Sequence, residues 1–498
     1  MALIRRPLVV VSVALVVRLG MVLWSQVGPY SESPSTLSSI YFRQGYAIAA
    51  GLGFVVGEGE ANAFLSDLQN RVNRGEVVAK PGLLEVAPPG IYADTLHPPG
   101  MSLLVAATHR LFQIPADVPL QLVGAILDSL AAGLVYWIGW RLLGHRAAVV
   151  AGLLYALFLP QAWAVTGAQM PDGLIGPFIV AMAASYLVAI DSVGWRSARW
   201  FMLAGVTLGL GSYLRPDYLL VPLALMPFLW LYSRRFSFAI VGSMIVVTVA
   251  FVVLLPWAYR NHNVYDRWIF TSSGAGATLI TGLGEFSNPW GIGSTDEHRQ
   301  EEALSNGFRS AWVPEADAHF RRVWWGAVRD APGAFLLTMV KRLPLGLAPP
   351  LSFGYKNPAK TQTFTELRGA GEDRYQALVD KPSYIVAAYW DVLAMAAFSG
   401  LALLASIWWM ASDRRRWRLI LLLLSIHFYS VGVHLLIHIE PRFLLPSMFV
   451  LLFGLAWVLT KPRPRTAKQK HSINHRASSV HAQHSDEGTC SRVSRALE

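Results

Sequence analysis

Apolar segments of about twenty residues alternate with short polar connections along most of the chain; residues 8–24, 238–257 and 443–460 are examples. A helix needs about 20 residues, at about 1.5 Å each, to cross the roughly 30 Å hydrocarbon layer of a membrane. The pattern therefore predicts a polytopic, all-helical membrane protein. Chemistry is then expected in the loops and at the helix ends.

Basic residues occur in every second connection, and this asymmetry predicts the orientation of the helices. Short loops rich in lysine and arginine stay in the cytoplasm. The basic clusters lie at residues 5–6, 141–146, 196–199, 234–235, 414–418 and from 461 onward. The resulting ten spans are, approximately, residues 7–27, 119–142, 147–166, 171–190, 199–214, 217–233, 237–258, 384–411, 417–438 and 442–460. Both termini are then cytoplasmic.

The same assignment leaves two long external loops, residues 28–118 and 259–383. Each loop contains an apolar stretch, Met101–Phe112 in the first and Ala334–Pro349 in the second. We expect both stretches to form helices in the outer interface, because they are too short or too interrupted to cross. A crossing by the second stretch would make the number of spans odd.

Composition and charge support the membrane assignment and indicate a polar, basic tail at the C-terminal end. Hydrophobic residues make up 54% of the chain, and the net charge is +11. Anionic lipid headgroups explain the basic loops better than nucleic acid does. The single cysteine, Cys490, excludes a disulfide framework and a cysteine metal cluster. We expect a transmembrane domain at residues 1–460 and a disordered, basic, cytoplasmic tail at 461–498.

Several short motifs fall at the predicted outer helix ends, and this shared position is their most informative property. They are Leu96-His97-Pro98-Pro99-Gly100, Gln169-Met170-Pro171-Asp172-Gly173, Leu214-Arg215-Pro216-Asp217, Pro256-Trp257-Ala258-Tyr259-Arg260-Asn261 and His438-Ile439-Glu440-Pro441-Arg442-Phe443. A glycine-rich stretch at 274–284 would let the backbone approach a ligand closely.

Each motif also has a purely structural explanation. The two prolines suit the start of a helix, and Asp172 could cap one. An ion pair between Arg215 and Asp217 would hold a tight turn. His434, His438 and Glu440 could be imagined as metal ligands, but no complete set is evident. We therefore predict no metal site and leave a divalent cation open.

Charged residues at helix ends suit a phosphorylated lipid, because a guanidinium group makes two parallel hydrogen bonds to phosphate oxygens. Arg43, Arg260 and Arg442 are the candidates, with anchoring at the headgroup layer as the alternative. Arg18 and Asp128 lie inside predicted spans. They are either functional groups or a structural pair within the bundle.

Together these motifs resemble the bacterial membrane glycosyltransferases with the GT-C fold, a family that includes protein O-mannosyltransferases, the aminoarabinose transferase and core galacturonosyltransferase-like proteins. The resemblance covers residues 1–460. It rests on Tyr41 through Gly51-Leu52-Gly53-Phe54, on the motifs above and on Glu440 through Pro446. It implies a plasma (inner) membrane enzyme with an external active site, which moves a hexose or pentose from a polyprenyl phosphate or diphosphate carrier. The acceptor would be an envelope glycan, lipid or protein.

The resemblance also implies roles for residues. The family's base is an acid shortly before the tyrosine matched by Tyr41, where this chain has Leu37-Ser38-Ser39-Ile40. Glu32, the nearest acid, and Asp172 are the catalytic candidates. The basic residue before the two prolines is often lysine in the family and is His97 here. The substrate-binding candidates are Tyr41, Arg43, His97, Arg215, Tyr259, Arg260, Glu440 and Arg442.

Three alternatives stay open at this stage. One is a structural or assembly scaffold, which would not need His97, Asp172 and Arg442 to converge. The missing acid is compatible with a catalytically altered member of the family. A transporter or flippase of lipid-linked glycans would also handle such a lipid, although transporters commonly show inverted repeats and broken helices at the midplane, and this sequence shows neither. The sequence does not indicate which sugar, carrier, acceptor or oligomeric state the protein has.

Overall fold

The structure is a computed structural model that describes residues 2–27, 36–57, 59–76, 88–167, 169–349, 351 and 382–461. Residues Met1–Leu459 form one compact unit, and Thr460–Glu498 are separate from it. Apart from Lys461, the predicted disordered tail at 461–498 lies outside the described residues.

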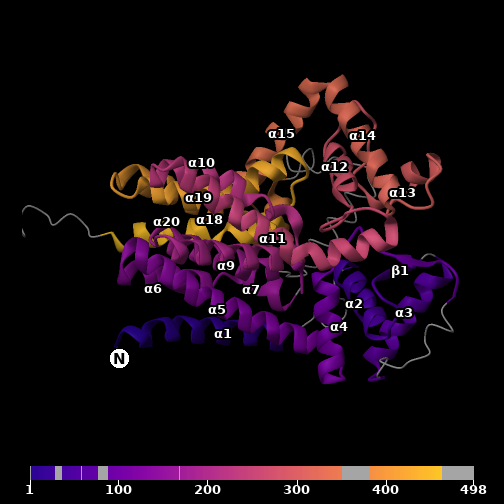
Figure 1. Ribbon diagram of the computed structural model, residues 1–498, viewed down its shortest axis with the longest axis horizontal. Helices are drawn as coiled ribbons and strands as arrows, with labels where there is room; N and C mark the ends of the chain where they lie inside the picture. The colour runs from indigo at the N-terminus through magenta and orange to yellow at the C-terminus, as the bar shows by residue number, and fades with distance from the viewer. Residues whose placement is uncertain are drawn as a thin grey trace, which may run out of the picture. The chain divides into compact units, whose positions relative to one another are not determined.

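Long apolar helices make up most of the compact unit (Figure 1). They are α1 (Ala2–Val27), α5 (Asp117–Leu143), α6 (His145–Ala156), α7 (Leu159–Thr166), α8 (Pro171–Ile190), α9 (Trp195–Ser212), α10 (Val221–Ser233), α11 (Phe236–Tyr265), α18 (Pro382–Ser412), α19 (Trp417–Leu436) and α20 (Phe449–Thr460). Two short 3-10 helices, η2 (Pro216–Tyr218) and η3 (Pro441–Ser447), precede α10 and α20. The all-helical, multi-pass fold class is confirmed.

Six helices in the described part of the chain, α1, α5, α8, α11, α18 and α19, are long and apolar enough to cross a membrane. The number rises to eight if two bent pairs, α6 with α7 and η3 with α20, each form one span. Their breaks are bent by 47° and 64°. The other two of the ten predicted spans coincide with α9 and α10. α10 has only 13 residues, and α9 begins with a polar turn that contains two arginines.

The described parts of the two predicted external loops are folded, and Figure 1 shows their elements gathered beyond one end of the long helices. The first loop contains α2 (Thr36–Ala49), α3 (Glu60–Asn73) and α4 (Gly100–Phe112). It also contains a two-stranded antiparallel sheet of β1 (Val55–Gly57) and β2 (Ile91–Ala93), which the sequence did not predict. The helix expected at 101–112 is α4.

In its described part, the second loop continues from the end of α11 into four helices. They are α12 (Ala275–Leu283), α13 (Asp296–Ser305), α14 (Pro314–Asp330) and α15 (Pro332–Leu347). Side chains of α12, α13 and α14 form a hydrophobic core of their own around Phe320. α15 is the helix expected at 334–349, and its 16 residues are too few for a span.

A fully buried ion pair joins four helices inside the bundle. Arg18 Nε donates to Asp128 Oδ2 at 2.8 Å, and both side chains are inaccessible to solvent. Asp128 Oδ1 accepts hydrogen bonds from Tyr155 Oη at 2.6 Å and Gln161 Nε2 at 2.8 Å. Gln161 also donates to the Gly173 carbonyl at the start of α8. Since every carboxylate oxygen is satisfied from within the bundle, the structural explanation of this pair is favoured.

Candidate active site

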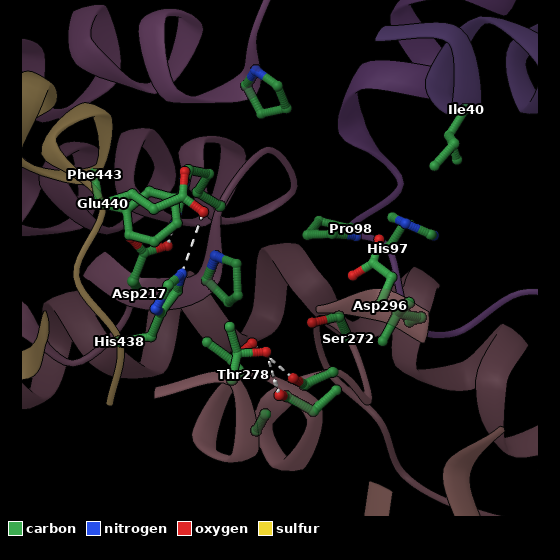
Figure 2. A pocket seen from close by; sticks show the side chains of 18 of the residues that line it. Ile40, His97, Pro98, Asp217, Ser272, Thr278, Asp296, His438, Glu440 and Phe443 are labelled. Carbon is green, nitrogen blue, oxygen red and sulfur yellow. Dashed lines mark hydrogen bonds and ion pairs between the residues drawn. The ribbon is translucent and has the colours of Figure 1, made fainter. Parts of the chain in front are cut away.

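A cavity of about 1770 Å³ lies where the two folded loops meet the helix ends. Its volume exceeds the roughly 300–1,000 Å³ of ordinary ligand pockets, so it has room for two substrates. Figure 2 shows His97 and Pro98 on one side and Asp217, Glu440 and Phe443 on the other. Among the sequence-predicted site residues, it is lined by Tyr41, Arg43, His97, Asp172, Arg215, Glu440 and Arg442.

The motif around His97 is fixed to the loop that carries Arg215. The Gly100 amide donates to the Tyr213 carbonyl at 2.7 Å. A Cβ at Gly100 would lie 2.6 Å from that oxygen, so this approach requires glycine. Pro98 also restricts the backbone of His97 to extended conformations. Sequence segments more than a hundred residues apart are therefore held together at the cavity wall.

Asp94 is a buried acid that the sequence reasoning did not choose. Its Oδ2 lies 2.7 Å from His97 Nδ1, and its Oδ1 accepts from the Leu96 amide at 2.7 Å. Gln44 Nε2 also donates to Asp94 Oδ2. Burial alone would raise the pKa of Asp94, but the charge and hydrogen bond of His97 lower it below its usual value. The three-residue spacing of Asp94 and His97 was the only sequence signal for this pair.

Tyr41 packs beside this pair as expected for a cavity residue. Its ring meets the His97 ring edge-on, with the ring centres 5.7 Å apart. Burial raises the pKa of Tyr41 to about 12, and the charges of Arg215, Asp94 and Arg442 also act on its hydroxyl. The hydroxyl is therefore a neutral hydrogen-bonding group at neutral pH. It lies within electrostatic reach of both sides of the cavity.

Arg260 and Tyr259 do not line the cavity, in contrast to the sequence-based expectation. Arg260 donates to the backbone carbonyls of Asp94 and Phe54, at 3.0 and 2.9 Å. Arg260 therefore holds the first loop in place, and these two carbonyls satisfy its donors. The Tyr259 side chain is 60% exposed on the outside of α11. Arg43 does line the cavity, where its Nη1 donates to Asn62 Oδ1 at 2.7 Å.

Arg215 lies between two acids. It forms an ion pair with Asp172, and its Nε donates to Asp217 Oδ1 at 3.0 Å. Its guanidinium carbon lies 4.1 Å from the centre of the Phe443 ring. The N-cap residue of α8 is Met170, and Asp172 lies in the first turn of the helix, where the helix dipole also favours an acid. The ion pair expected between Arg215 and Asp217 is present.

Glu440 and Arg442 form a second ion pair on the same wall. Arg442 Nε lies 2.6 Å from Glu440 Oε2. Arg442 Nη1 lies 4.0 Å from the Met170 sulphur, a weak acceptor. Burial opposes the negative charge of Glu440, but the hydrogen bond from His438 and the charge of Arg442 lower its pKa to about 2. These contacts of Arg442 use Nε and Nη1, so Nη2 remains as a donor for an anion in the cavity.

The histidines weighed as metal ligands are used in other ways. α19 ends at Leu436, so His434 and His438 do not share a helical face. His434 Nε2 lies 3.4 Å from Asp217 Oδ2. His438 lies between Glu285 and Glu440, with 3.2 Å from Nε2 to Glu440 Oε1 (Figure 2). No group of three or more potential metal ligands occurs among the described residues.

A fully buried arginine, Arg342, supports this wall from the second loop. Its Nε donates to Glu285 Oε2 at 2.6 Å, and its Nη1 donates to the Leu435 carbonyl at 2.6 Å. Glu285 in turn accepts from the Ile439 amide at 2.9 Å. This contact could not be predicted from local sequence, because Arg342 and Glu285 are 57 residues apart.

The glycine-rich stretch serves packing between segments of the protein. A Cβ at Gly282 would collide with the Ile437 carbonyl oxygen, and one at Gly276 would collide with that of Asp317. The space that was expected to admit a ligand is thus occupied by protein backbone at both positions. Glu32, the other catalytic candidate, lies outside the described residues.

Residues 96–259 match the model of the dolichyl-phosphate-mannose-protein mannosyltransferase family. The matched segment begins at the His97 motif and includes Asp172 and Arg215. No curated protein matches the chain.

Three solved structures of the Archaeoglobus fulgidus oligosaccharyltransferase are similar in fold. The apo form has a TM-score of 0.46 and 14% identity, covering 98% of this chain and 53% of that one. The complex with Zn and sulfate has a TM-score of 0.43 and 15% identity, covering 90% and 49%. The AglB complex with an inhibitory peptide and a dolichol-phosphate has a TM-score of 0.43 and 14% identity, covering 97% and 52%. This chain spans about half the length of these proteins. The family match agrees with the resemblance drawn from the motifs: residues 96–259 are similar to a family of membrane glycosyltransferases, and the chain is a multi-pass membrane protein.

Proposed function

We propose that this protein transfers a sugar from a polyprenyl-phosphate-type carrier to a glycan, lipid or protein acceptor of the cell envelope. The observation that carries the proposal is the single cavity, in which Arg215, Arg442 and His97 come together with several acids. The matched family is named for a donor of this class, dolichyl-phosphate mannose. A lipid phosphate needs cationic donors at the end of an apolar helix bundle, and this cavity offers them.

The arginines are the proposed phosphate-binding groups. Transfer displaces a phosphate from the anomeric carbon, so negative charge develops on the departing oxygen. Arg442 offers the unpaired edge of its guanidinium to that oxygen. Arg215 adds positive charge behind it, and Asp172 and Asp217 hold Arg215 in place. In this role Asp172 acts through Arg215. Tyr41 and Arg43 line the same cavity and are the side chains that we propose to contact sugar hydroxyl groups.

A divalent cation is not required by this arrangement. The acids of the cavity wall are already engaged: Asp172 and Asp217 with Arg215, and Glu440 with Arg442 and His438. A cation bound there would have to displace an arginine or a histidine from its carboxylate. Transfer that persists in a chelator such as EDTA is the expected result. Loss of transfer in EDTA that magnesium or manganese restores would assign a cation to the site.

We infer that the cavity opens on the external side of the plasma membrane and that both termini are cytoplasmic. Both loops that build the cavity are external in the topology predicted from charge. Cys490 is the only cysteine, so it can report the side of the tail without further mutation. A membrane-impermeant maleimide should label Cys490 only after the cells are permeabilised. In a Cys490→Ser background, an Asn306→Cys variant at an exposed position of the second loop should be labelled in intact cells. The opposite pattern would reverse the orientation.

Mass analysis of envelope glycolipids and glycoproteins, with and without this protein, tests the function and identifies the acceptor. We expect one acceptor to lose a single hexose or pentose when the protein is absent. Purified protein in proteoliposomes with a polyprenyl-phosphate sugar and that acceptor should then form the product. Movement of the donor across the bilayer without a new glycosidic bond would instead support a flippase. A loss in cells without transfer by the purified protein would support an altered, non-catalytic member of the family.

A further inference from the structure

We propose that His97, held by Asp94, is the general base that accepts the proton of the acceptor hydroxyl. This inference rests on the proposed glycosyl transfer. It addresses the absence of an acid from residues 37–40, the position at which similar enzymes carry their base. The pair lies in the same external loop but about fifty residues further along the chain.

The surroundings of Asp94 keep its carboxylate ionised and directed at His97. Its side chain is only 1% exposed, yet both carboxylate oxygens are hydrogen-bonded. The Leu96 amide binds Oδ1, while Gln44 and His97 bind Oδ2. Ser102 Oγ donates to Gln44 Oε1 at 2.9 Å and thereby orients the Gln44 amide. A buried carboxylate with this many donors is ionised and immobile.

His97 presents its second ring nitrogen to the cavity. Its Nδ1 lies 2.7 Å from Asp94 Oδ2, and an ionised Asp94 can only accept a hydrogen bond, so Nδ1 carries the hydrogen. In the neutral ring this leaves the lone pair on Nε2. Nε2 has no hydrogen-bond partner among the described residues, and the side chain is 17% exposed at the cavity wall. A histidine oriented by a carboxylate in this way is the usual form of a general base.

The backbone fixes the position of this pair relative to the phosphate-binding side. Thr95 docks on Ser273 of the second loop through a 2.7 Å bond from the Ser273 amide to the Thr95 carbonyl. Gly100 docks on Tyr213, two residues before Arg215. Asp94 and His97 are therefore clamped from both ends. A base and a leaving-group cation on opposite sides of one cavity are what an in-line displacement at carbon needs.

The acceptor oxygen forms a bond to the anomeric carbon while the bond from that carbon to the phosphate oxygen breaks. The phosphate leaves with the electron pair as the polyprenyl phosphate, next to Arg442. The acceptor proton moves to His97 Nε2, and Asp94 stabilises the resulting imidazolium. The proton is then released to water, which returns the ring to its neutral state.

The main competing role for His97 is to bind the donor phosphate as a cation, as the lysine often found at this position in similar enzymes would do. The two roles predict opposite results. A base must be neutral, so the rate falls at acid pH and lysine cannot replace histidine at neutral pH. A phosphate-binding cation is most effective at acid pH, and lysine would replace it well.

The experiment compares His97→Gln, His97→Lys and Asp94→Asn with wild type in the proteoliposome transfer assay. We expect His97→Gln and His97→Lys to lower kcat by about 10²–10⁴-fold with little change in the KM for the donor. The acid limb of the wild-type pH–rate profile should be absent from the residual activity of His97→Gln. Asp94→Asn should lower kcat with little change in the donor KM, because the ring loses the carboxylate that orients it. His145→Gln, outside the cavity, is the matched control and should behave as wild type.

Three results would overturn the inference. An active His97→Lys variant, or a His97→Gln variant whose defect is confined to the donor KM, would assign His97 to phosphate binding. Normal turnover by His97→Gln together with a large loss in Glu32→Gln, but not in Glu58→Gln, would assign the base to Glu32. A wild-type protein that transfers no sugar would instead overturn the proposed function, and this inference with it. Unchanged melting temperatures of the two His97 variants in detergent show that a kcat effect is chemical.

Discussion

Arg442 and Glu440 form an ion pair on the cavity wall, with Arg442 Nε 2.6 Å from Glu440 Oε2. Glu440 also binds His438, which binds Glu285, which binds the fully buried Arg342. A chain of charges therefore links the proposed phosphate-binding group to the second long loop. Side chains that touch the substrate and side chains that only support them should differ in what their mutation changes.

Replacing Arg442 with alanine should lower kcat for sugar transfer by about 10²–10³-fold, because it removes a donor to the departing phosphate oxygen. The melting temperature in detergent should change far less than kcat does, since Glu440 keeps its contact with His438. Arg442→Lys should retain part of the activity, because an ammonium keeps the charge without the planar pair of donors. If both variants instead lose folded protein in proportion to activity, Arg442 is a structural residue.

Replacing Arg342 with alanine should act on stability. The change leaves Glu285 without its cation and removes donors from the Leu435 and Gly282 carbonyls. Breaking a buried ion pair from one side costs about 3–5 kcal/mol of folding free energy. A large fall in melting temperature is expected, with normal turnover by the fraction that stays folded. Lys341→Ala, at an exposed neighbouring position, is the matched control and should melt like wild type.

The helical, multi-pass fold could be predicted because segment length and hydrophobicity are local properties of the sequence. The boundaries of α9 and α10 could not be predicted in the same way. The 3-10 helix η2 lies between them, and α10 is short; both features depend on packing with neighbouring helices. The strands β1 and β2 were missed because three residues give no readable alternation, and their partners are separated by α3.

The candidate site could be predicted only in part for a similar reason. Arg215, Arg442 and His97 were found because each lies in a motif at a helix end. Asp94 was passed over because nothing local distinguishes it from other loop acids; its burial comes from α2 and the two strands. The binding of Arg260 to backbone carbonyls could not be predicted from the sequence either, because its partners Phe54 and Asp94 are more than 160 residues away.

The charge chain on the cavity wall also predicts a pH dependence of stability. Burial opposes the positive charge of His438, but the hydrogen bonds and charges of Glu285 and Glu440 raise its pKa above the usual value of 6.5. The resulting stabilisation is complete below about pH 6.5 and is lost as the pH rises through the raised pKa.

The contribution of Glu440 to stability depends on pH in the opposite direction. Its pKa falls from 4.5 to about 2, so its contribution is present above about pH 4.5 and is lost as the pH falls toward 2. The melting temperature should therefore be highest between about pH 4.5 and 6.5 and should decline at alkaline pH. His438→Gln should remove most of the alkaline decline, since an amide does not titrate. A decline of the same size in His438→Gln would assign the pH dependence to other groups.

Asp128 provides a test of whether a charge inside the bundle is functional or structural. It accepts hydrogen bonds from Arg18, Tyr155 and Gln161 and is inaccessible to solvent. Asp128→Ala leaves Arg18 buried without a counter-ion, so we expect a loss of about 3–5 kcal/mol, measured as a fall in unfolding temperature in detergent. Asp128→Asn should cost less, because an amide oxygen still accepts from two of the donors. Turnover per folded molecule should stay close to wild type in Asp128→Asn, since neither Asp128 nor its partners Arg18, Tyr155 and Gln161 line the cavity. A stable Asp128→Asn protein with a large fall in kcat would instead place this intramembrane pair in the catalytic machinery.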